Sequence, residues 1–115
     1  MANTFEVITK AGVTSADVIY TVAGSTTTVV LGLVLGNTTS SSITATVTLT
    51  SDTSGRAGNN DEANQAVELL TATPIPGNSS LEILSGNKVV LEATDTLSVT
   101  GSGATDVALS VMEIT

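Results

Sequence analysis

The side chains that could perform chemistry in this chain are carboxylates and hydroxyls. The sequence has eleven Asp and Glu residues but no His and no Cys, so proton transfer would fall to carboxylates and a nucleophile would have to be Ser or Thr. Asp61 and Glu62 form an adjacent acidic pair, but adjacent side chains diverge in an extended chain. No serine lies in a Gly-x-Ser-x-Gly turn, and Gly101-Ser-Gly103 precedes a strand pattern, whereas a phosphate-binding loop precedes a helix. We therefore predict no catalytic residue, no cofactor and no enzymatic activity.

A segment rich in glycine and asparagine runs from Ser51 to Gln65. Its oxygen-bearing side chains suit calcium, and they are Asp52, Asn59, Asn60, Asp61 and Glu62. Their spacing matches no EF-hand, so a calcium site is the less favoured of two interpretations. The favoured one is a loop at a rim of the fold that contacts a partner and requires no metal. Its predicted contact residues are Asp52, Arg56, Asp61 and Glu62, and Arg56 is one of only three cations in the chain.

The elements that would position these residues are short β-strands. Between Thr44 and Thr50, threonine alternates with Ala45, Val47 and Leu49. Successive strand residues point to opposite faces, so this pattern predicts one face toward a core and one hydroxyl-lined face toward water or a partner. Related patterns recur between clusters of Gly, Asn, Asp and Ser. The predicted strands are Phe5–Thr9, Val18–Val22, Thr27–Leu35, Ile43–Ser51, Val67–Thr73, Ser80–Leu84, Val89–Ala93, Thr96–Thr100 and Asp106–Ile114.

Eight or nine short strands in 115 residues predict one all-β domain spanning residues 1–115, an antiparallel β-sandwich or jelly roll. One helical alternative remains for Asp61–Leu70, where Ala63, Ala66 and Leu70 would share a helical face. The predicted core consists of apolar residues from the alternating segments, namely Val29, Leu31, Leu33, Val47, Leu49, Leu91, Leu97, Val99, Leu109 and Val111.

The segment Thr27–Leu35 is apolar on both of its faces, unlike the other predicted strands. One side is predicted to carry Val29, Leu31, Leu33 and Leu35, and the other carries Val30 and Val34 on either side of Gly32. A strand that is apolar on both sides is covered on both sides, either by a loop of its own chain or by a neighbouring subunit. Val30 and Val34 are accordingly the predicted subunit-interface residues.

Composition narrows the classes of function and partner. The net charge is −8, which repels nucleic-acid backbones. The apolar run from Val29 to Leu35 is too short to cross a bilayer, and the amino-terminal residues show no secretion signal, so no membrane partner is expected. With one Tyr, one Phe, no Trp and no disulfide, the core lacks large rings and covalent links. Subunit contacts are the expected supplement to its stability, and a homotrimer is the favoured assembly.

Several segments together resemble small β-rich virion structural proteins of tailed phages, especially those of marine and cyanobacterial phages. The similar segments are Met1-Ala-Asn-Thr-Phe, Tyr20-Thr-Val, Thr26-Thr-Thr-Val-Val-Leu-Gly-Leu, Pro74-Ile-Pro-Gly-Asn-Ser-Ser-Leu-Glu, Gly86-Asn-Lys-Val-Val-Leu, Asp95-Thr-Leu-Ser-Val and Met112-Glu-Ile-Thr. Many phage modules with this pattern carry glycine before the aspartate of a turn, where this chain has Thr94. The resemblance implies a structural protein of the virion that is assembled in the host cytoplasm and released by lysis.

The resemblance and the charge together favour a non-enzymatic capsid decoration protein on the particle exterior, with the major capsid protein as a partner. A neck, collar or tail-attached subunit is the alternative. A receptor- or glycan-binding module is less favoured, because such sites usually present aromatic platforms and Phe5 and Tyr20 are the only rings in the chain.

Overall fold

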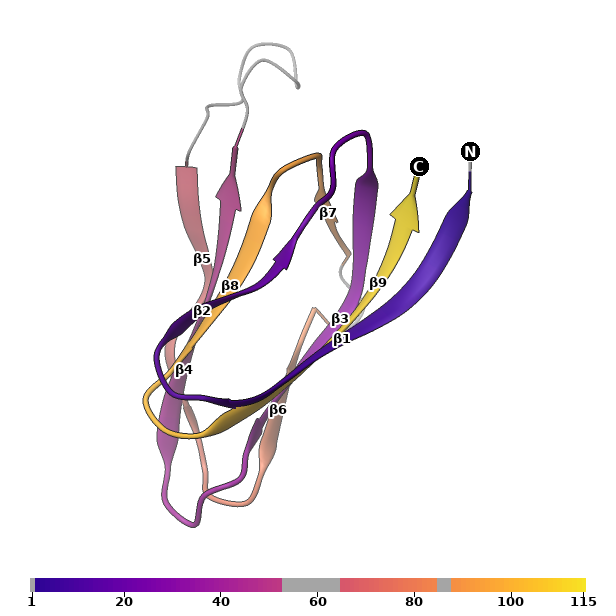
Figure 1. The fold of residues 1–115 in the computed structure, drawn as a ribbon. Helices are drawn as coiled ribbons and strands as arrows, with labels where there is room; N and C mark the ends of the chain where they lie inside the picture. The colour runs from indigo at the N-terminus through magenta and orange to yellow at the C-terminus, as the bar shows by residue number, and fades with distance from the viewer. Residues whose placement is uncertain (1, 53–64, 85–87) are drawn as a thin grey trace.

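A computed structural model describes residues 2–52, 65–84 and 88–115. These residues form nine β-strands and no helix, which confirms the predicted all-β class (Figure 1). The strands are β1 (Asn3–Val13), β2 (Ala16–Thr21), β3 (Thr27–Asn37), β4 (Ile43–Ser51), β5 (Gln65–Ile75), β6 (Ser80–Ile83), β7 (Val89–Leu91), β8 (Thr96–Gly101) and β9 (Thr105–Ile114). The helical alternative is wrong for residues 65–70, because Val67 and Leu70 pair with Leu49 and Val47 of β4.

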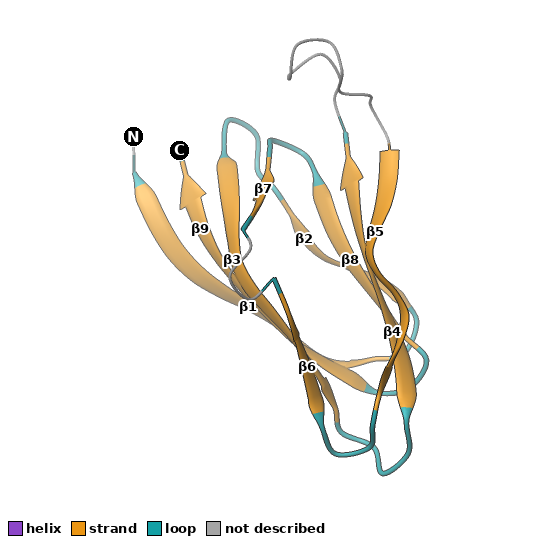
Figure 2. Cartoon of the chain, turned by 180° about the vertical axis from the view of Figure 1, so that it is seen from behind, coloured by secondary structure: helices purple, strands orange, loops and turns teal. Residues whose placement is uncertain are grey.

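The strands form two antiparallel sheets that pack face to face (Figure 2). Sheet A has the order β1-β9-β3-β6, and β7 also pairs with β3; sheet B has the order β2-β8-β4-β5. Because β6 and β7 pair with successive parts of β3, they act as one interrupted strand. The pairs β1–β9, β2–β8, β3–β6/β7 and β4–β5 then make one long antiparallel ribbon. When this ribbon folds over on itself, β3 also pairs with β9 and β4 also pairs with β8, which gives the topology of a jelly roll.

The alternation in β4 has the outcome that its sequence predicts. Ile43, Ala45 and Val47 are buried between the sheets, and the intervening threonines are half-buried on the outer side. The core also contains Leu33, Leu91, Leu97, Val99, Leu109 and Val111, all of which are buried as expected. Leu49 is half-buried and packs against this core.

The facing of β3 differs from the sequence prediction because of a β-bulge. The register between β3 and β9 shifts between Val30 and Gly32, so the side chains on the two sides of this point are out of phase. Val30 therefore faces the core with Leu33 and Leu35, and it is 0% exposed. Val29 and Leu31 are only half-buried, so their assignment to the core interior is wrong.

The turn between β7 and β8 places Thr94 in an unusual backbone conformation. Asp95 N–H donates to the carbonyl of Glu92 at 3.0 Å, which closes the turn, and Thr94 has a φ of +69°. A β-branched residue in this left-handed region is strained, and glycine is the residue that adopts it freely. Thr94 N–H also donates to the carbonyl of Val22, so the strained conformation is held by the segment that follows β2 in the same chain.

We expect the Thr94→Gly substitution to stabilise the fold by about 0.5–1 kcal/mol, because relief of the strain exceeds the entropic cost of glycine in the unfolded chain. Chemical denaturation would measure the change. Thr38→Gly, in the exposed connection after β3, is the control, and it should stabilise nothing because Thr38 is not in this region of backbone conformation. Equal or lower stability of the Thr94→Gly variant would contradict the strain.

Candidate interaction surfaces

The outer side of sheet B carries a regular array of hydroxyl groups, here called the hydroxyl wall. It consists of Thr46, Thr48, Thr50, Thr96, Ser98 and Thr100 on the adjacent strands β4 and β8. The register pairs them directly across the two strands as Thr46 with Thr100, Thr48 with Ser98, and Thr50 with Thr96. All six are half-buried, and Val18 of β2 and Glu68 of β5 flank the middle pair. None of the six wall residues is charged, and Glu68 lies at the edge of the wall.

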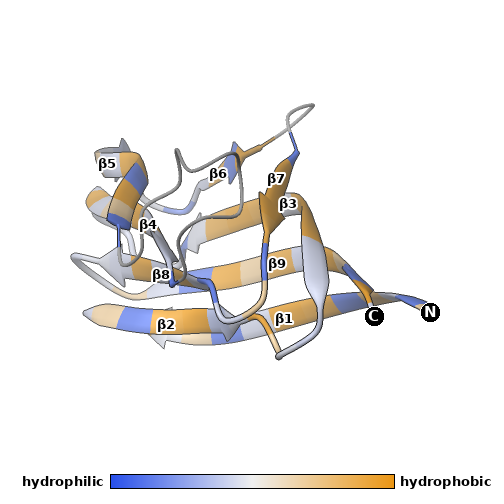
Figure 3. Ribbon diagram, turned by 90° about the horizontal axis from the view of Figure 1, so that it is seen from above, coloured by the Kyte–Doolittle hydropathy of each residue, from blue (hydrophilic) through white to orange (hydrophobic). Residues whose placement is uncertain are grey.

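The outer side of sheet A has a different chemistry, because apolar residues form a row across four strands. Phe5 of β1 lies opposite Met112 of β9, which lies opposite Val29 of β3, which lies opposite Val90 of β7. Phe5 is 70% exposed and Val90 is 57% exposed. Seen from above, apolar residues recur along β1, β9, β3 and β7 (Figure 3).

A second row on the same side runs from Val7 of β1 through Ser110 of β9 to Gly32 of β3. A third contains Ala108 and Val34 and ends at the carboxylate of Glu82 on β6. The name apolar face is used below for this outer side of sheet A, defined by Phe5, Val7, Val29, Val34, Val90, Ala108 and Met112. Its first two rows contain no charged side chain.

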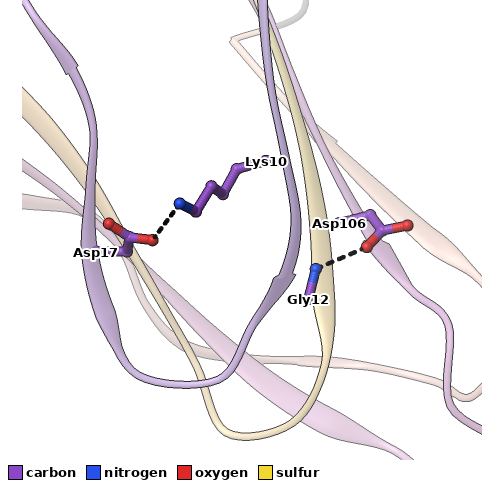
Figure 4. Close-up of polar contacts among 4 residues, drawn as sticks. All are labelled: Lys10, Gly12, Asp17 and Asp106. Atoms are coloured by element: carbon purple, nitrogen blue, oxygen red, sulfur yellow. Dashed lines mark hydrogen bonds and ion pairs between the residues drawn. The ribbon is translucent and has the colours of Figure 1, made fainter.

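Charged groups gather instead near the connection between β1 and β2 (Figure 4). The Lys10 ammonium lies 3.4 Å from a carboxylate oxygen of Asp17, and both side chains are substantially exposed. Gly12 has a φ of +67°, and its N–H donates to Asp106 Oδ1 at 3.0 Å. This hydrogen bond ties the end of β1 to the start of β9, so Asp106 stabilises the corner of the fold. A solvent-exposed ion pair such as Lys10–Asp17 contributes little to stability.

Of the predicted rim-loop residues, only Asp52 falls within the described residues. Its side chain is exposed, and its backbone N–H donates to Asp95 Oδ1 at 3.0 Å. Asp95 is buried, and its other oxygen accepts a hydrogen bond from the Glu92 N–H at 2.9 Å, so this carboxylate joins the end of β4 to the β7–β8 turn. Arg56, Asp61 and Glu62 lie outside the described residues, so the loop remains a prediction.

The two predicted interface residues of β3 are separated by the bulge. Val30 is enclosed by its own sandwich, so its side chain cannot reach a neighbouring subunit in this fold, and its assignment to an interface needs correction. Val34 lies on the apolar face and is 37% exposed. It remains available for contact with another chain.

The exposed positions of Phe5, Val7, Val18 and Val90 are not evident from the sequence pattern. All four are large apolar side chains that are more than half exposed. The sequence does indicate that Phe5 and Val7 share one face of a strand, because they alternate with Glu6 and Ile8. Alternation alone does not say which face is inward, and the polar Glu6 lies on the core-facing side of this edge strand, opposite Val111.

Three polar side chains join the two sheets near the end where the termini meet. The Tyr20 hydroxyl of β2 donates to Glu113 Oε2 of β9 at 2.5 Å and lies 2.8 Å from Thr28 Oγ1 of β3. The pKa of Tyr20 is raised from 10.0 to about 12, chiefly by burial and also by the hydrogen bond to Glu113 and the negative charges of Glu113 and Glu6, against a lowering by Thr28. The neutral phenol is therefore the form that the fold favours.

Because folding raises the pKa of Tyr20, its contribution to stability should be fully present below pH 10 and should be lost as the pH rises toward about 12. Tyr20 is the only tyrosine, so the ultraviolet absorbance of tyrosinate reports its titration directly. The native protein should titrate near 12 and the denatured protein near 10. The Glu113→Gln variant should lower the native midpoint, because it removes the negative charge. Identical midpoints in the native and denatured proteins would contradict the inter-sheet contact.

No three acidic side chains within residues 2–52, 65–84 and 88–115 come together as a group that could hold a metal ion. Those residues also include no helix that is long and apolar enough to cross a membrane. Asn59, Asn60, Asp61 and Glu62 of the calcium alternative lie outside them.

In sequence, no family model and no curated protein matches the chain. Among solved structures, one described as "Bacillus endospore appendages form a novel family of disulfide-linked pili" is similar with a TM-score of 0.49 and 15% identity, over 99% of this chain and 87% of that chain. A second, from the "T13 IBDV viral particle", has a TM-score of 0.27 and 13% identity, over 98% of this chain and 39% of that one. At these values the similarities assign no family and no function to the chain.

Proposed function

We propose that this chain is a non-enzymatic structural subunit of a virion, specifically a capsid decoration protein bound to the outside of the particle. The observation that carries the proposal is the hydroxyl wall on sheet B. The virion setting comes from the resemblance of the sequence to small structural proteins of tailed phages.

The hydroxyl wall suits attachment to a repeating protein surface. Its side chains are spaced about 4.8 Å apart across the strands and about 7 Å apart along them, as in any regular sheet. A hydroxyl can both donate and accept a hydrogen bond, so the wall can adapt to carbonyl and amide groups of a partner. Within the fold, Thr46 Oγ1 already accepts from the Ala72 N–H and Ser98 Oγ donates to the Thr48 carbonyl. The six wall residues carry no charge, so burying them avoids the largest desolvation cost of protein association, with the carboxylate of Glu68 on β5 left at the edge of the contact.

The net charge supports a position on the exterior. A surface that lines packaged DNA would bring the carboxylates of a chain with a net charge of −8 against phosphates, with a Coulombic cost that salt screens only in part. On the outside of a particle the same charge favours solubility and discourages non-specific aggregation.

A subunit of the neck, collar or tail is the second candidate position. Such a ring has closed cyclic symmetry and needs few copies, whereas a decoration protein covers the whole capsid. A glycan-binding module has weaker support from the geometry, because Tyr20 is buried in its inter-sheet contact and Phe5 is left as the one exposed ring. A single exposed ring offers little stacking surface for sugars.

Copy number distinguishes the two positions. Quantitative mass spectrometry of particles purified from the source culture should give on the order of hundreds of copies per particle for a decoration protein and about a dozen for a ring. Antibody labelling of negatively stained particles would locate the chain independently. If the chain is missing from purified particles, the virion role is wrong.

The role of the wall can be tested on the same particles. The Thr48→Val and Thr100→Val double substitution keeps the shape of both side chains and removes two hydroxyls. We expect the folded variant to bind particles from which this chain has been removed at least 10-fold more weakly, which corresponds to a loss of about 1.4 kcal/mol of binding free energy for the two hydroxyls together. Thr9→Val, which removes an exposed hydroxyl from β1 of sheet A, is the matched control and should bind normally. If the double variant bound as tightly as Thr9→Val, the chain would attach to the particle through another surface.

A further inference from the structure

The apolar face of sheet A stands out because it is uncharged in a strongly acidic chain. The chain has eleven acidic residues against three cations, yet the two rows Phe5–Met112–Val29–Val90 and Val7–Ser110–Gly32 contain neither. The carboxylates of Glu82 and Asp106 lie toward the other end of this side, opposite Val34 and Gly36, and Lys88 and Glu92 directly precede and follow β7 at its edge. Exposed apolar residues that are contiguous over several strands usually mark an interaction site.

We propose that this face packs against the same face of a second copy of the chain, forming a two-fold symmetric homodimer. The charge pattern selects the partner, because two copies that each carry a net charge of −8 repel one another wherever carboxylates meet. The two uncharged rows let two such chains approach without that cost. Attraction between the chains then comes from removing Phe5, Val7 and Val90 from water.

The available area is sufficient for a stable pair. Four strands about 4.8 Å apart, namely β1, β9, β3 and then β7 or β6, over about ten residues of β3 and β9 at about 3.3 Å each, give roughly 600 Å² for the whole projected face, which includes the rows that hold Glu82 and Asp106. Two such faces bury about 1,200 Å² in total, which is the lower end for specific protein interfaces. Two twisted sheets can pack in this way with their strands nearly aligned, as the sheets of a sandwich do.

The geometry favours a pair over the trimer expected from composition. A flat sheet face is covered completely by one other flat face, and two identical faces meet by a two-fold axis in the plane between them. The pairing does not rest on the virion role proposed above. The hydroxyl wall lies on the other sheet and stays free, so a dimer could attach to a particle through either subunit.

The first test compares two valines of equal exposure. Val90 on the apolar face and Val18 on the outer side of sheet B are both 57% exposed. Light scattering of the purified wild-type chain at micromolar concentration should give twice its 11.5 kDa mass. Val90→Asp and Phe5→Asp should weaken association about 100-fold or more and give the single-chain mass, because each would bury a carboxylate in the interface. Val18→Asp adds the same charge outside it and should remain dimeric.

Circular dichroism and thermal melting would establish that each variant is folded. A second measurement uses the wild-type protein and so needs no variant to fold. Phe5 is the only phenylalanine in the chain, so its ring protons can be assigned without ambiguity. In a mixture of isotope-labelled and unlabelled chains, filtered NMR spectra should show intermolecular contacts from this ring to methyl groups of the apolar face.

Four outcomes would overturn the pairing. They are a wild-type chain that remains monomeric at about 100 µM, a trimeric mass, equal dissociation by Val18→Asp and Val90→Asp, and filtered spectra in which the Phe5 ring has no intermolecular contact. Because all of these measurements use the purified chain without particles, failure of the pairing is distinct from failure of the virion role.

Discussion

Replacing Leu109 with alanine is expected to lower the free energy of unfolding by about 3–5 kcal/mol. Leu109 is 0% exposed at the centre of β9 and lies directly between Leu33 of β3 and Ile8 of β1 in the register of sheet A. The substitution removes buried methyl groups and leaves a cavity that the rigid sheet cannot close. The one phenylalanine is exposed, and the one tyrosine is held in place by its hydrogen bonds to Thr28 and Glu113, so neither large ring is free to move into the space.

Denaturation by urea, followed by far-ultraviolet circular dichroism, would measure the effect. A loss of this size approaches the whole stability of some domains, so the Leu109→Ala variant could be largely unfolded. The smaller Leu109→Val substitution should lower the stability less and keep the chain folded. Val18→Ala, at an apolar side chain that is 57% exposed, is the control and should change stability by less than about 0.5 kcal/mol. Similar losses for Leu109→Ala and Val18→Ala would mean that β9 is not the central strand of the core.

The positions of the strands could be predicted because two local signals agree. Threonine alternates with apolar residues in β4, and clusters of turn-forming residues separate this strand from its neighbours. Burial follows the same two-residue period, as in Ala45 and Val47. Each predicted strand therefore overlaps an observed one, although the ends of β1 and β3 extend further than their patterns suggested. Pairing with β9 extends both strands beyond the residues whose alternation is clear.

The facing of β3 could not be predicted in the same way. Its apolar residues lie on both sides, so neither phase of the alternation was distinguished by a polar residue. The bulge between Val30 and Gly32 then changes the phase, and it depends on pairing with β9, a strand about 80 residues away in the sequence. This long-range contact moves Val30 into the core and leaves Val29 outside, where it joins the apolar face.

Buried polar groups are the other feature that the sequence did not reveal. Asn37 is only 3% exposed at the end of β3. Its Nδ2 group donates to the carbonyls of Ser41, Ile75 and Pro76, at 2.8, 2.9 and 3.2 Å. Its Oδ1 atom accepts hydrogen bonds from the backbone and hydroxyl of Thr39. An asparagine beside a turn is ordinary in sequence, and only the fold shows that this one joins β3, the β3–β4 connection and the end of β5.

The Asn37→Asp substitution keeps the size of this side chain and reverses its role, so it should destabilise the protein by about 3–5 kcal/mol at neutral pH. The carboxylate has no hydrogen to donate, and it would face the carbonyl oxygens of Ser41, Ile75 and Pro76. The protonated acid would be favoured in the folded state, which raises the pKa of the new group above its unfolded value. The destabilisation should therefore be smallest below about pH 4 and should grow as the pH rises above it.

Denaturant unfolding of the Asn37→Asp variant between acidic and neutral pH would measure this dependence against the wild-type chain. Thr38→Asp is the matched control, because it places the same charge on the adjacent residue, whose side chain is exposed. The control should unfold near the wild-type midpoint at every pH. If both variants lost the same stability, the effect would come from added charge on an already acidic chain. A loss confined to Asn37→Asp, and reduced in acid, would instead show that the donor hydrogens of one amide hold this end of the sandwich together.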